Sequence, residues 1–200
     1  VEGDDVSPVY YMKEGIYPVR NAKVEADEGK AVVSWDAPMP EFRYDSGVYA
    51  DNLGFGTNND NAVFGAAWRH SAKLHEVSWY LSSAVDKHVT VKLYVFGLNP
   101  DGTPTKNAVY EEYVPSNDDT WNTYKFDTPL DLPDGFCIAL GSTSFLGIGA
   151  WLPNEEYPLE YGTFWYCSDL TLGDMVPWHE MHEFTEPTLM IRAVGEDYGV

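Results

Sequence analysis

The sequence predicts an all-β protein whose main domain is an antiparallel sandwich or barrel. Apolar residues mostly alternate with polar ones, which is the period of a half-buried strand, and no window of eleven or more residues shows a persuasive helical period. Aromatic residues make up 15% of the 200 residues, mostly in short runs with Val and Thr, the vocabulary of strands. Turn-forming segments separate these runs at short intervals, as in sandwiches and barrels.

The first 40 residues predict a polar leader followed by a β-hairpin. Two apolar-alternating runs, one through Val19 and Val24 and the other through Val33 and Trp35, flank the turn ADEGK. Because an isolated hairpin is marginal in water, we expect this one to dock on the main domain or on a segment outside the sequence. The proline-bearing link APMPE marks the boundary, so the predicted domains are residues 1–40 and 41–200.

Nine runs in the second domain predict strands. In the clearest, 89–98, Val89, Val91 and Leu93 fall on one face, whereas Lys92 and Tyr94 fall on the other. Links rich in Pro, Asn, Asp and Gly separate the runs, and helices between them are not expected. The predicted strands are 63–68, 75–83, 89–98, 108–114, 123–127, 135–141, 146–152, 162–168 and 188–196.

The charge is strongly acidic, with 12 Lys and Arg against 32 Asp and Glu and a formal net charge of -20. A nucleic-acid partner is therefore not expected, because phosphates need a basic face, and an anionic membrane surface is disfavoured for the same reason. No stretch approaches the roughly 20 apolar residues of a transmembrane helix. Solubility is the simplest role of the acids, and Ca²⁺ binding by loop carboxylates is the alternative.

The chain begins with Val on the polar run VEGDDVSP, which is typical of a spacer left after a targeting segment is removed. We therefore expect a secreted, periplasmic or cell-surface protein, with a lipid anchor on a removed N-terminal segment as one option. Cys137 and Cys167 both lie in apolar runs, and two buried thiols or one disulfide are both open. Neither has a partner at C-x-x-C spacing, which excludes a zinc ribbon.

The segment PWHEMHEF, residues 177–184, raises the question of a zinc site. The protease signature H-E-x-x-H places histidines at i and i+4 on a helix, but His179 and His182 are three residues apart. Prolines bracket the segment, which disfavours a long helix. If Trp178 begins an edge strand, the two histidines point to opposite faces, and we expect no zinc there.

A resemblance to a known family adds to this interpretation. The pattern P-V-x-x-A, a Gly turn, S-W-x-A-P and then FRYDSG resembles the start of adhesin modules in secreted Bacteroidetes proteins, including the cleaved-adhesin domains of gingipain-type proteases. Trp178 and PTLMIRAVGE resemble the family's late edge strand and closing strand. The resemblance implies a jelly-roll sandwich related to galactose-binding-like modules, preceded by a hairpin similar to the opening of a fibronectin type III domain.

No cofactor is expected from the sequence, and a structural Ca²⁺ is the one option that its residues offer. Asp45 lies in the turn FRYDSG, where Gly47 lets backbone carbonyls face a cation. The resemblance implies a structural Ca²⁺ near this turn and the last strand, shared by Asp45 with Glu41 or Glu196. A second oxygen-rich loop centres on Asp60. Ordinary turn chemistry is the alternative, because tight turns use the same residues.

Catalytic motifs are weak in this sequence. The adjacent pairs Glu111–Glu112 and Glu155–Glu156 would point to opposite faces of a strand, whereas glycoside hydrolysis needs two facing acids. There is no G-x-S-x-G elbow and no phosphate-binding loop with its lysine. An enzyme is therefore not expected, although a hydrolase, or an accessory domain of one, is the alternative function.

Aromatic residues near loops are the predicted ligand contacts. Such residues stack on sugar rings while nearby amides bind hydroxyl groups, and they also anchor protein contacts. The sequence thus predicts a noncatalytic exported binding module for carbohydrate or a cell-surface protein, with a structural spacer as a further alternative. The predicted contact residues are Trp121, Trp151, Tyr157, Tyr161 and Trp165.

Overall fold

The computed structural model describes nine stretches of the chain. The chain divides into two compact units, Val1–Met39 and Pro40–Val200, and the division falls inside the link where the sequence predicts the domain boundary. In the described stretches, no helix has the length and hydropathy that crossing a bilayer requires. The described residues are 20–27, 30–36, 39–55, 59–82, 88–142, 146–151, 162–171, 178–181 and 188–199.

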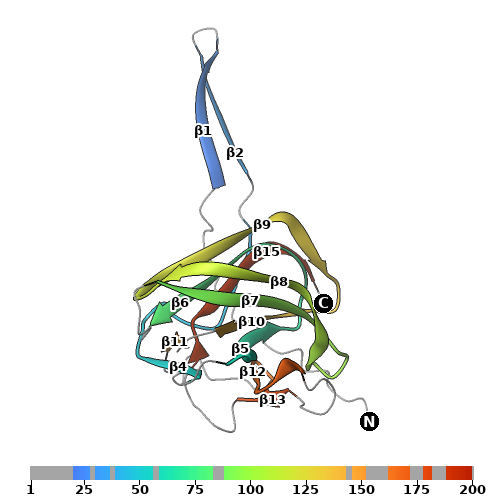
Figure 1. The fold of residues 1–200 in the computed structure, drawn as a ribbon. Coiled ribbons are helices and arrows are strands. Elements are labelled where there is room, and N and C mark those ends of the chain that lie inside the picture. Colours follow the sequence, from blue (N-terminus) through green and yellow to red (C-terminus); the bar gives the residue numbers. More distant parts are fainter. Residues whose placement is uncertain are drawn as a thin grey trace. The chain divides into compact units, whose positions relative to one another are not determined.

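The first unit contains the predicted hairpin. Strands β1 (Arg20–Asp27) and β2 (Lys30–Asp36) pair antiparallel around the expected turn (Figure 1). Its apolar side chains are exposed: Val24 is 72% and Val33 53% accessible to solvent. The alternation that predicts two strands therefore holds, but the described side chains of this unit form no core of their own.

In the second unit, one antiparallel sheet has six strands in the order β13-β12-β5-β10-β7-β8. The short strand β13 follows Trp178 at one edge, as the sequence predicts, and the long strand β8 forms the other edge. The strands are β5 (Asn59–Trp68), β7 (His88–Leu98), β8 (Pro104–Asn117), β10 (Phe136–Ser142), β12 (Phe164–Cys167) and β13 (His179–Glu180).

The other sheet has seven strands and is organised around β6, which pairs with β9, β11 and β15. Strand β3 pairs with β15, while β4 and β14 pair with β11. The strands are β3 (Glu41–Arg43), β4 (Asp51–Phe55), β6 (Ser71–Ser82), β9 (Thr120–Leu132), β11 (Leu146–Trp151), β14 (Thr188–Leu189) and β15 (Ile191–Gly199).

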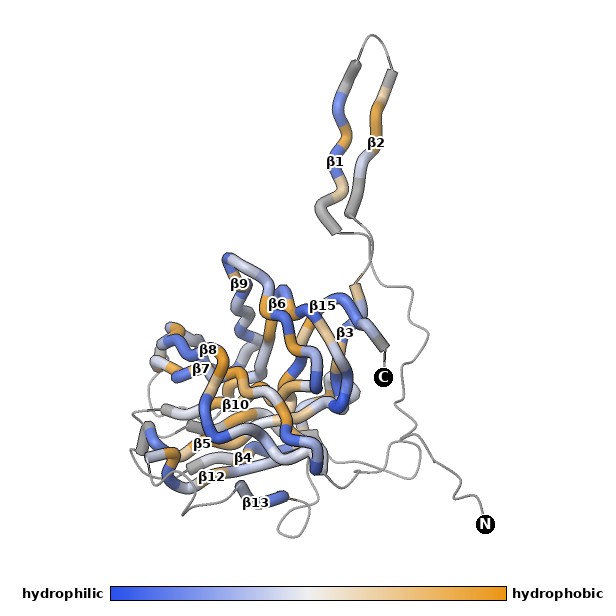
Figure 2. The backbone as a smooth tube through the Cα atoms, turned by 90° about the vertical axis from the view of Figure 1, so that its right-hand side faces the viewer, coloured by the Kyte–Doolittle hydropathy of each residue, from blue (hydrophilic) through white to orange (hydrophobic). Residues whose placement is uncertain are grey.

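The main core lies between these two sheets and takes side chains from both. On β7, Val91, Leu93 and Val95 are fully buried in it. Tyr94 and Phe96 alternate with them and belong to a second apolar cluster on the outer face of the six-stranded sheet. Figure 2 shows the corresponding alternation of hydrophobic and hydrophilic residues along the strands.

The predicted jelly-roll sandwich of an all-β chain is confirmed, and each of the nine predicted runs contains a strand. The last run is divided into β14 and β15 at Met190. The sequence analysis missed β3 and β4, which are short and placed by pairing with β15 and β11. Both cysteines are free and buried: β10 carries Cys137 and β12 carries Cys167, on opposite sides of β5.

Candidate ligand-binding groove

A groove of about 440 Å³ lies on the outer face of the six-stranded sheet. It is bounded by β7, the edge strand β8, and the turn that follows β12. This volume falls within the usual range of small-molecule sites. The lining residues that carry its chemistry are Asn61, Lys92, Tyr94, Lys106, Asn107 and Glu111.

Aromatic rings form the base of the groove. Tyr94 and Phe96 stack with ring centres 5.7 Å apart and planes 20° from parallel. Phe96 also meets the edge of Trp178, with 5.0 Å between ring centres. The period-two geometry of β7 explains why both rings leave the main core. Burial raises the pKa of Tyr94, so its hydroxyl stays protonated at neutral pH and is able to donate a hydrogen bond.

Lys92 brings a positive charge to this aromatic base. Its Nζ lies 4.9 Å from the ring centre of Tyr94 and 5.2 Å from that of Tyr113, both cation–π distances. It also lies 3.5 Å from Oε2 of Glu111. Burial lowers the pKa of Lys92, but the hydrogen bond to Tyr94 and the charge of Glu111 outweigh burial, so the pKa is raised. The ammonium group is thus charged and held in place.

The polar groups around these rings suit a hydroxylated ligand. Asn61 and Asn107 supply amides, and Thr171 supplies a hydroxyl at the rim. Among the described lining residues Glu111 is the one carboxylate, so these residues by themselves do not supply a facing pair of acids. The described lining thus combines apolar rings at the base with hydrogen-bonding groups at the walls.

Trp121, a predicted contact residue, lies on the other sheet. It is half-buried on β9, and the guanidinium of Arg192 lies 4.2 Å from its ring centre. Tyr80 meets it edge-on at 5.9 Å, and Tyr49 packs on Tyr80 at 5.5 Å. Trp121 therefore belongs to an aromatic row on the outer face of the seven-stranded sheet and takes no part in the groove.

The structure corrects the prediction for Trp165. This residue is 6% exposed and packs in the apolar cluster under the groove, while its Nε1 donates a hydrogen bond to the carbonyl of Gly162 at 2.9 Å. It is a packing residue, because it belongs to the second apolar cluster, against which Leu170 and Trp178 also pack. The side chain of Trp151 and all of Tyr157 and Tyr161 lie outside the described residues.

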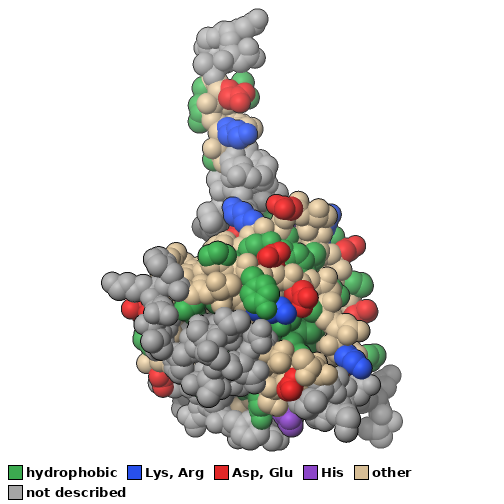
Figure 3. Space-filling model, viewed as in Figure 1, with side chains coloured by type: hydrophobic (Ala, Val, Ile, Leu, Met, Phe, Trp, Pro, Cys, Tyr) green, Lys and Arg blue, Asp and Glu red, His purple; other side chains and the backbone are tan. Residues whose placement is uncertain are grey.

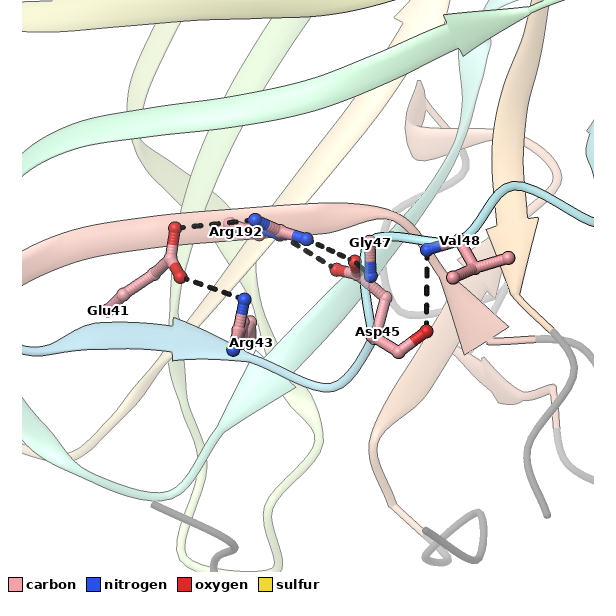
Figure 4. Close-up of polar contacts among 7 residues, drawn as sticks. Glu41, Arg43, Asp45, Gly47, Val48 and Arg192 are labelled. Carbon is pink, nitrogen blue, oxygen red and sulfur yellow. Dashed lines mark hydrogen bonds and ion pairs between the residues drawn. The ribbon is translucent and has the colours of Figure 1, made fainter. Parts of the chain in front are cut away.

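Asp45, the main calcium candidate, contacts an arginine (Figure 4). Its fully buried carboxylate accepts two hydrogen bonds from Arg192, Nε to Oδ2 at 3.1 Å and Nη2 to Oδ1 at 2.5 Å. It also accepts one from the amide of Gly47 at 2.8 Å. Burial lowers the pKa of Arg192, but Asp45 and Glu41 outweigh burial and raise it. In this arrangement a guanidinium meets the carboxylate that the sequence assigns to calcium.

The other two calcium candidates pair elsewhere. Glu41 lies on the opposite side of the guanidinium, 3.6 Å from Arg192 Nη1, and Glu196 accepts a 2.9 Å hydrogen bond from His75. In the described parts of the chain no three His, Cys, Asp or Glu side chains gather in a way that could hold a metal ion. A Ca²⁺ site stays a prediction, and the side chain of the second candidate, Asp60, lies outside the described residues.

The described part of the late histidine segment, residues 178–181, contains the edge strand that the sequence predicts. His179 is exposed and stacks on Tyr166 at 5.1 Å, whereas Glu180 is buried and accepts a hydrogen bond from the amide of Gly162 at 3.0 Å. His182 lies outside the described residues. The described part of the segment is extended, so it lacks the helix on which the H-E-x-x-H geometry depends.

The predicted ligand contacts do not include the groove residues, because the sequence argument places contacts in loops and the groove lies over strands. The alternation of β7 did place Lys92 and Tyr94 on the outer face. The missed signal is Tyr94 followed by Phe96 on that face, since two large rings on a nominally solvated side indicate a covered or ligand-binding surface. Lys106 and Asn107 precede the predicted strand 108–114, but β8 begins at Pro104 and carries them to the groove.

Comparisons with known proteins identify two solved structures with a similar fold. Neither a protein-family model nor a curated protein matches this sequence. A structure described as the cysteine protease and lectin-like domains of Cwp84, a surface layer associated protein of Clostridium difficile, is similar with a TM-score of 0.56 and 11% identity, over 84% of this chain and 38% of that one. The clostridial cysteine protease Cwp84 after propeptide cleavage gives a TM-score of 0.59 and 11% identity, over 82% and 42%.

This chain thus spans about two fifths of the length of those two chains. At 11% identity the likeness concerns the fold, and it agrees with the β-sandwich described above. The resemblance to Bacteroidetes adhesin modules stays a prediction.

Proposed function

We propose that this chain is a noncatalytic binding module of an exported, cell-surface protein and that it recognises carbohydrate in the groove of the six-stranded sheet. The observation that carries the proposal is the combination of the Tyr94 and Phe96 rings with the amides of Asn61 and Asn107 and the ammonium of Lys92. Sugar rings present apolar C–H faces and a rim of hydroxyl groups, and the groove offers partners for both.

The similarity in fold to Cwp84 supports the same proposal. Cwp84 is described as a surface layer associated protein with lectin-like domains. A sandwich of the same kind with a groove of recognition chemistry fits a lectin-like role on an exported protein. The single described carboxylate of the groove, Glu111, supports a binding module over a hydrolase.

A glycan array followed by titration calorimetry tests this function. Asn107→Ala removes an exposed amide from the groove wall, and we expect at least a tenfold loss of affinity, about 1.4 kcal/mol, for the glycan bound by the wild type. Thr123→Ala, an equally exposed position on the other sheet, is the matched control and should bind as the wild type does. Circular dichroism checks that both variants fold.

The aromatic row gives the test a second arm. If Trp121→Ala abolishes glycan binding while Asn107→Ala does not, the binding surface is the outer face of the seven-stranded sheet and the groove assignment is wrong. An array without any bound glycan would instead favour the spacer or a protein partner.

A further inference from the structure

We infer that the groove selects a neutral sugar through two adjacent hydroxyl groups, one accepting a hydrogen bond from Lys92 and the other donating one to Glu111. This inference rests on the proposed function and specifies both the ligand class and the two residues that select it. Its basis is a donor and an acceptor that lie side by side at the aromatic base of the groove.

The described charges at the groove balance one another. Lys92 and Lys106 line it together with Glu111, and Lys106 has an interaction partner within the protein. Asp169 adds a second carboxylate at the rim, because its Oδ1 accepts hydrogen bonds from the amide of Thr171 at 2.8 Å and from its hydroxyl at 2.6 Å. Two described lysines are thus matched by two described carboxylates, which favours a neutral ligand over an acidic or a basic one. On the face seen in Figure 3, acidic and basic side chains lie beside hydrophobic ones.

Lys92 is a donor whose position is largely set. Its side chain is 20% exposed, and its ammonium lies near the rings of Tyr94 and Tyr113. A lysine on a free surface samples many rotamers, and a ligand must restrict them at an entropic cost, whereas contacts within the protein already restrict Lys92. An ammonium group has three N–H donors, so the contacts with Tyr94 and Glu111 still leave a donor for a ligand hydroxyl.

Glu111 places an acceptor beside that donor. Its Oε2 lies 3.5 Å from Lys92 Nζ, on a side chain that is 60% exposed. A carboxylate has two oxygens and about four acceptor positions, so the contact with Lys92 uses only part of its capacity. An ion pair at this exposure is weak, and its geometry adjusts to a ligand at little cost.

Two adjacent hydroxyl groups of a pyranose ring fit this arrangement. A hydroxyl group both donates and accepts, so one can accept from the ammonium while its neighbour donates to the carboxylate. Hydroxyl groups on opposite sides of the ring are too far apart to meet two atoms that are in contact with each other. The ring of Tyr94 lies next to the pair, where the apolar face of the same sugar can pack on it.

The first test removes hydroxyl groups from the ligand. The probes are the methyl glycosides of glucose, galactose and mannose and their monodeoxy derivatives, titrated into the full chain by ligand-observed NMR. For the glycoside that binds best, loss of either of two neighbouring hydroxyl groups should lower the affinity about tenfold, because each makes a hydrogen bond to a charged group. Loss of any other hydroxyl group should lower it less than about threefold.

The second test couples each hydroxyl group to its residue. In Lys92→Met, which keeps the apolar stem, one of the two sensitive deoxy derivatives should bind as well as the parent sugar does, because the partner of the missing hydroxyl is already gone. In Glu111→Ala the same should hold for the other derivative. Glu112→Ala is the matched control, because it removes an adjacent exposed glutamate that does not line the groove, and it should keep the wild-type pattern.

The third test adds charge to the ligand. The forms of the best glycoside with a carboxylate or an amine at carbon 6 should bind no more tightly than the neutral sugar. Because the described charges at the groove balance, this order should be the same in about 50 mM and about 300 mM salt.

Four results would overturn the inference: no binding of any of the neutral glycosides, tighter binding of a charged form, sensitive hydroxyl groups that are not neighbours, or losses that stay the same in Lys92→Met and Glu111→Ala. The proposed function fails separately. If glycans bind and Asn107→Ala abolishes that binding, the groove is a carbohydrate site and only the selection by Lys92 and Glu111 is wrong.

Discussion

Asp45 and Arg192 show at the scale of single residues how a predicted metal ligand acquires a different role. The side chain of Asp45 is 0% exposed and that of Arg192 is 14% exposed. Breaking a buried ion pair by removing one partner is costly, because the remaining charge loses both water and its counter-ion. The pair joins the segment after β3 to the closing strand β15, two parts of the chain that are distant in sequence.

We therefore expect Asp45→Ala to lower the free energy of unfolding by about 3 kcal/mol or more. Glu41→Gln, which alters the partly exposed side of the same arginine, should cost less than about 1 kcal/mol. Urea denaturation followed by tryptophan fluorescence measures both. Equal small effects would show that Arg192 is well satisfied without Asp45.

Buried thiol and phenol groups should make the stability of the folded protein fall at alkaline pH. Burial raises the pKa of Cys137 and of Tyr94, so both stay protonated in the folded chain above the pH at which they ionise when unfolded. Those unfolded values are about 8.5 and about 10. The contribution of these groups is fully present below about pH 8.5, and it is lost as the pH rises, because the unfolded chain then releases protons that the folded chain retains.

The melting temperature should accordingly fall between about pH 8.5 and pH 10.5, after a plateau near neutrality. In Cys137→Ala the early part of this fall should be shallower, and near neutral pH the variant should be less stable than the wild type because it loses a buried sulfur. Differential scanning calorimetry across the pH range gives the comparison. Parallel curves for the two proteins would rule out a contribution from the thiol.

At the scale of elements, close strand packing depends on one small residue. A Cβ on Gly65 of β5 would lie 2.1 Å from the carbonyl oxygen of Ile138 on β10, a backbone atom that has no rotamer with which to move away. The register pairs β5 with both β10 and β12, so a shift of the backbone would disturb two ladders. Gly97 on β7 differs, since a Cβ there would meet only the Thr105 side chain at 3.7 Å.

Gly65→Ala is therefore expected to destabilise the protein by about 2 kcal/mol or more, and Gly97→Ala to change stability by less than about 0.5 kcal/mol. Chemical denaturation of the two variants tests the contrast. If both substitutions have the same effect, loss of backbone freedom, which they share, would explain it better than a clash does.

The elements differ in how well the sequence predicts them. Strand β7 has an apolar residue at every second position from Val89 to Val95 and was predicted within one residue, because the main core buries these residues on one face. Strand β4, DNLGF, combines three poor strand formers with two apolar residues, Leu53 and Phe55, and was missed. It is extended because β11 offers it a ladder of hydrogen bonds. The β-strand propensity of the residues predicts a strand poorly where pairing with a partner strand supplies most of the stabilisation.

At the scale of the whole molecule, the two compact units differ in what they bury. All buried residues of the described chain belong to Pro40–Val200, whereas the described side chains of β1 and β2 are exposed. A unit that contains all of the described core residues should fold on its own.

Deletion of residues 1–39 should therefore leave the sandwich folded, with the melting temperature within about 3 °C of the full chain, which corresponds to less than about 1 kcal/mol. Near-ultraviolet circular dichroism and calorimetry of the fragment measure this. Loss of the cooperative transition would mean that the hairpin is part of the folding unit, and that the boundary predicted at residues 37–41 is only a change in composition.

The sequence by itself determined the class of fold and the faces of most strands, because alternation every second residue is a local property that survives without knowledge of partners. It also predicted the hairpin and placed Lys92 and Tyr94 on the face opposite Val91 and Leu93. Only the tertiary structure decided which outward-facing residues meet. Asn61, Lys92 and Asn107 line one groove because β5, β7 and β8 belong to one sheet. Asp45 contacts Arg192, 147 positions away in the sequence, because the first and last strands of the sandwich pair. Such side-chain contacts depend on the order of the strands in the sheets, which local sequence patterns do not encode.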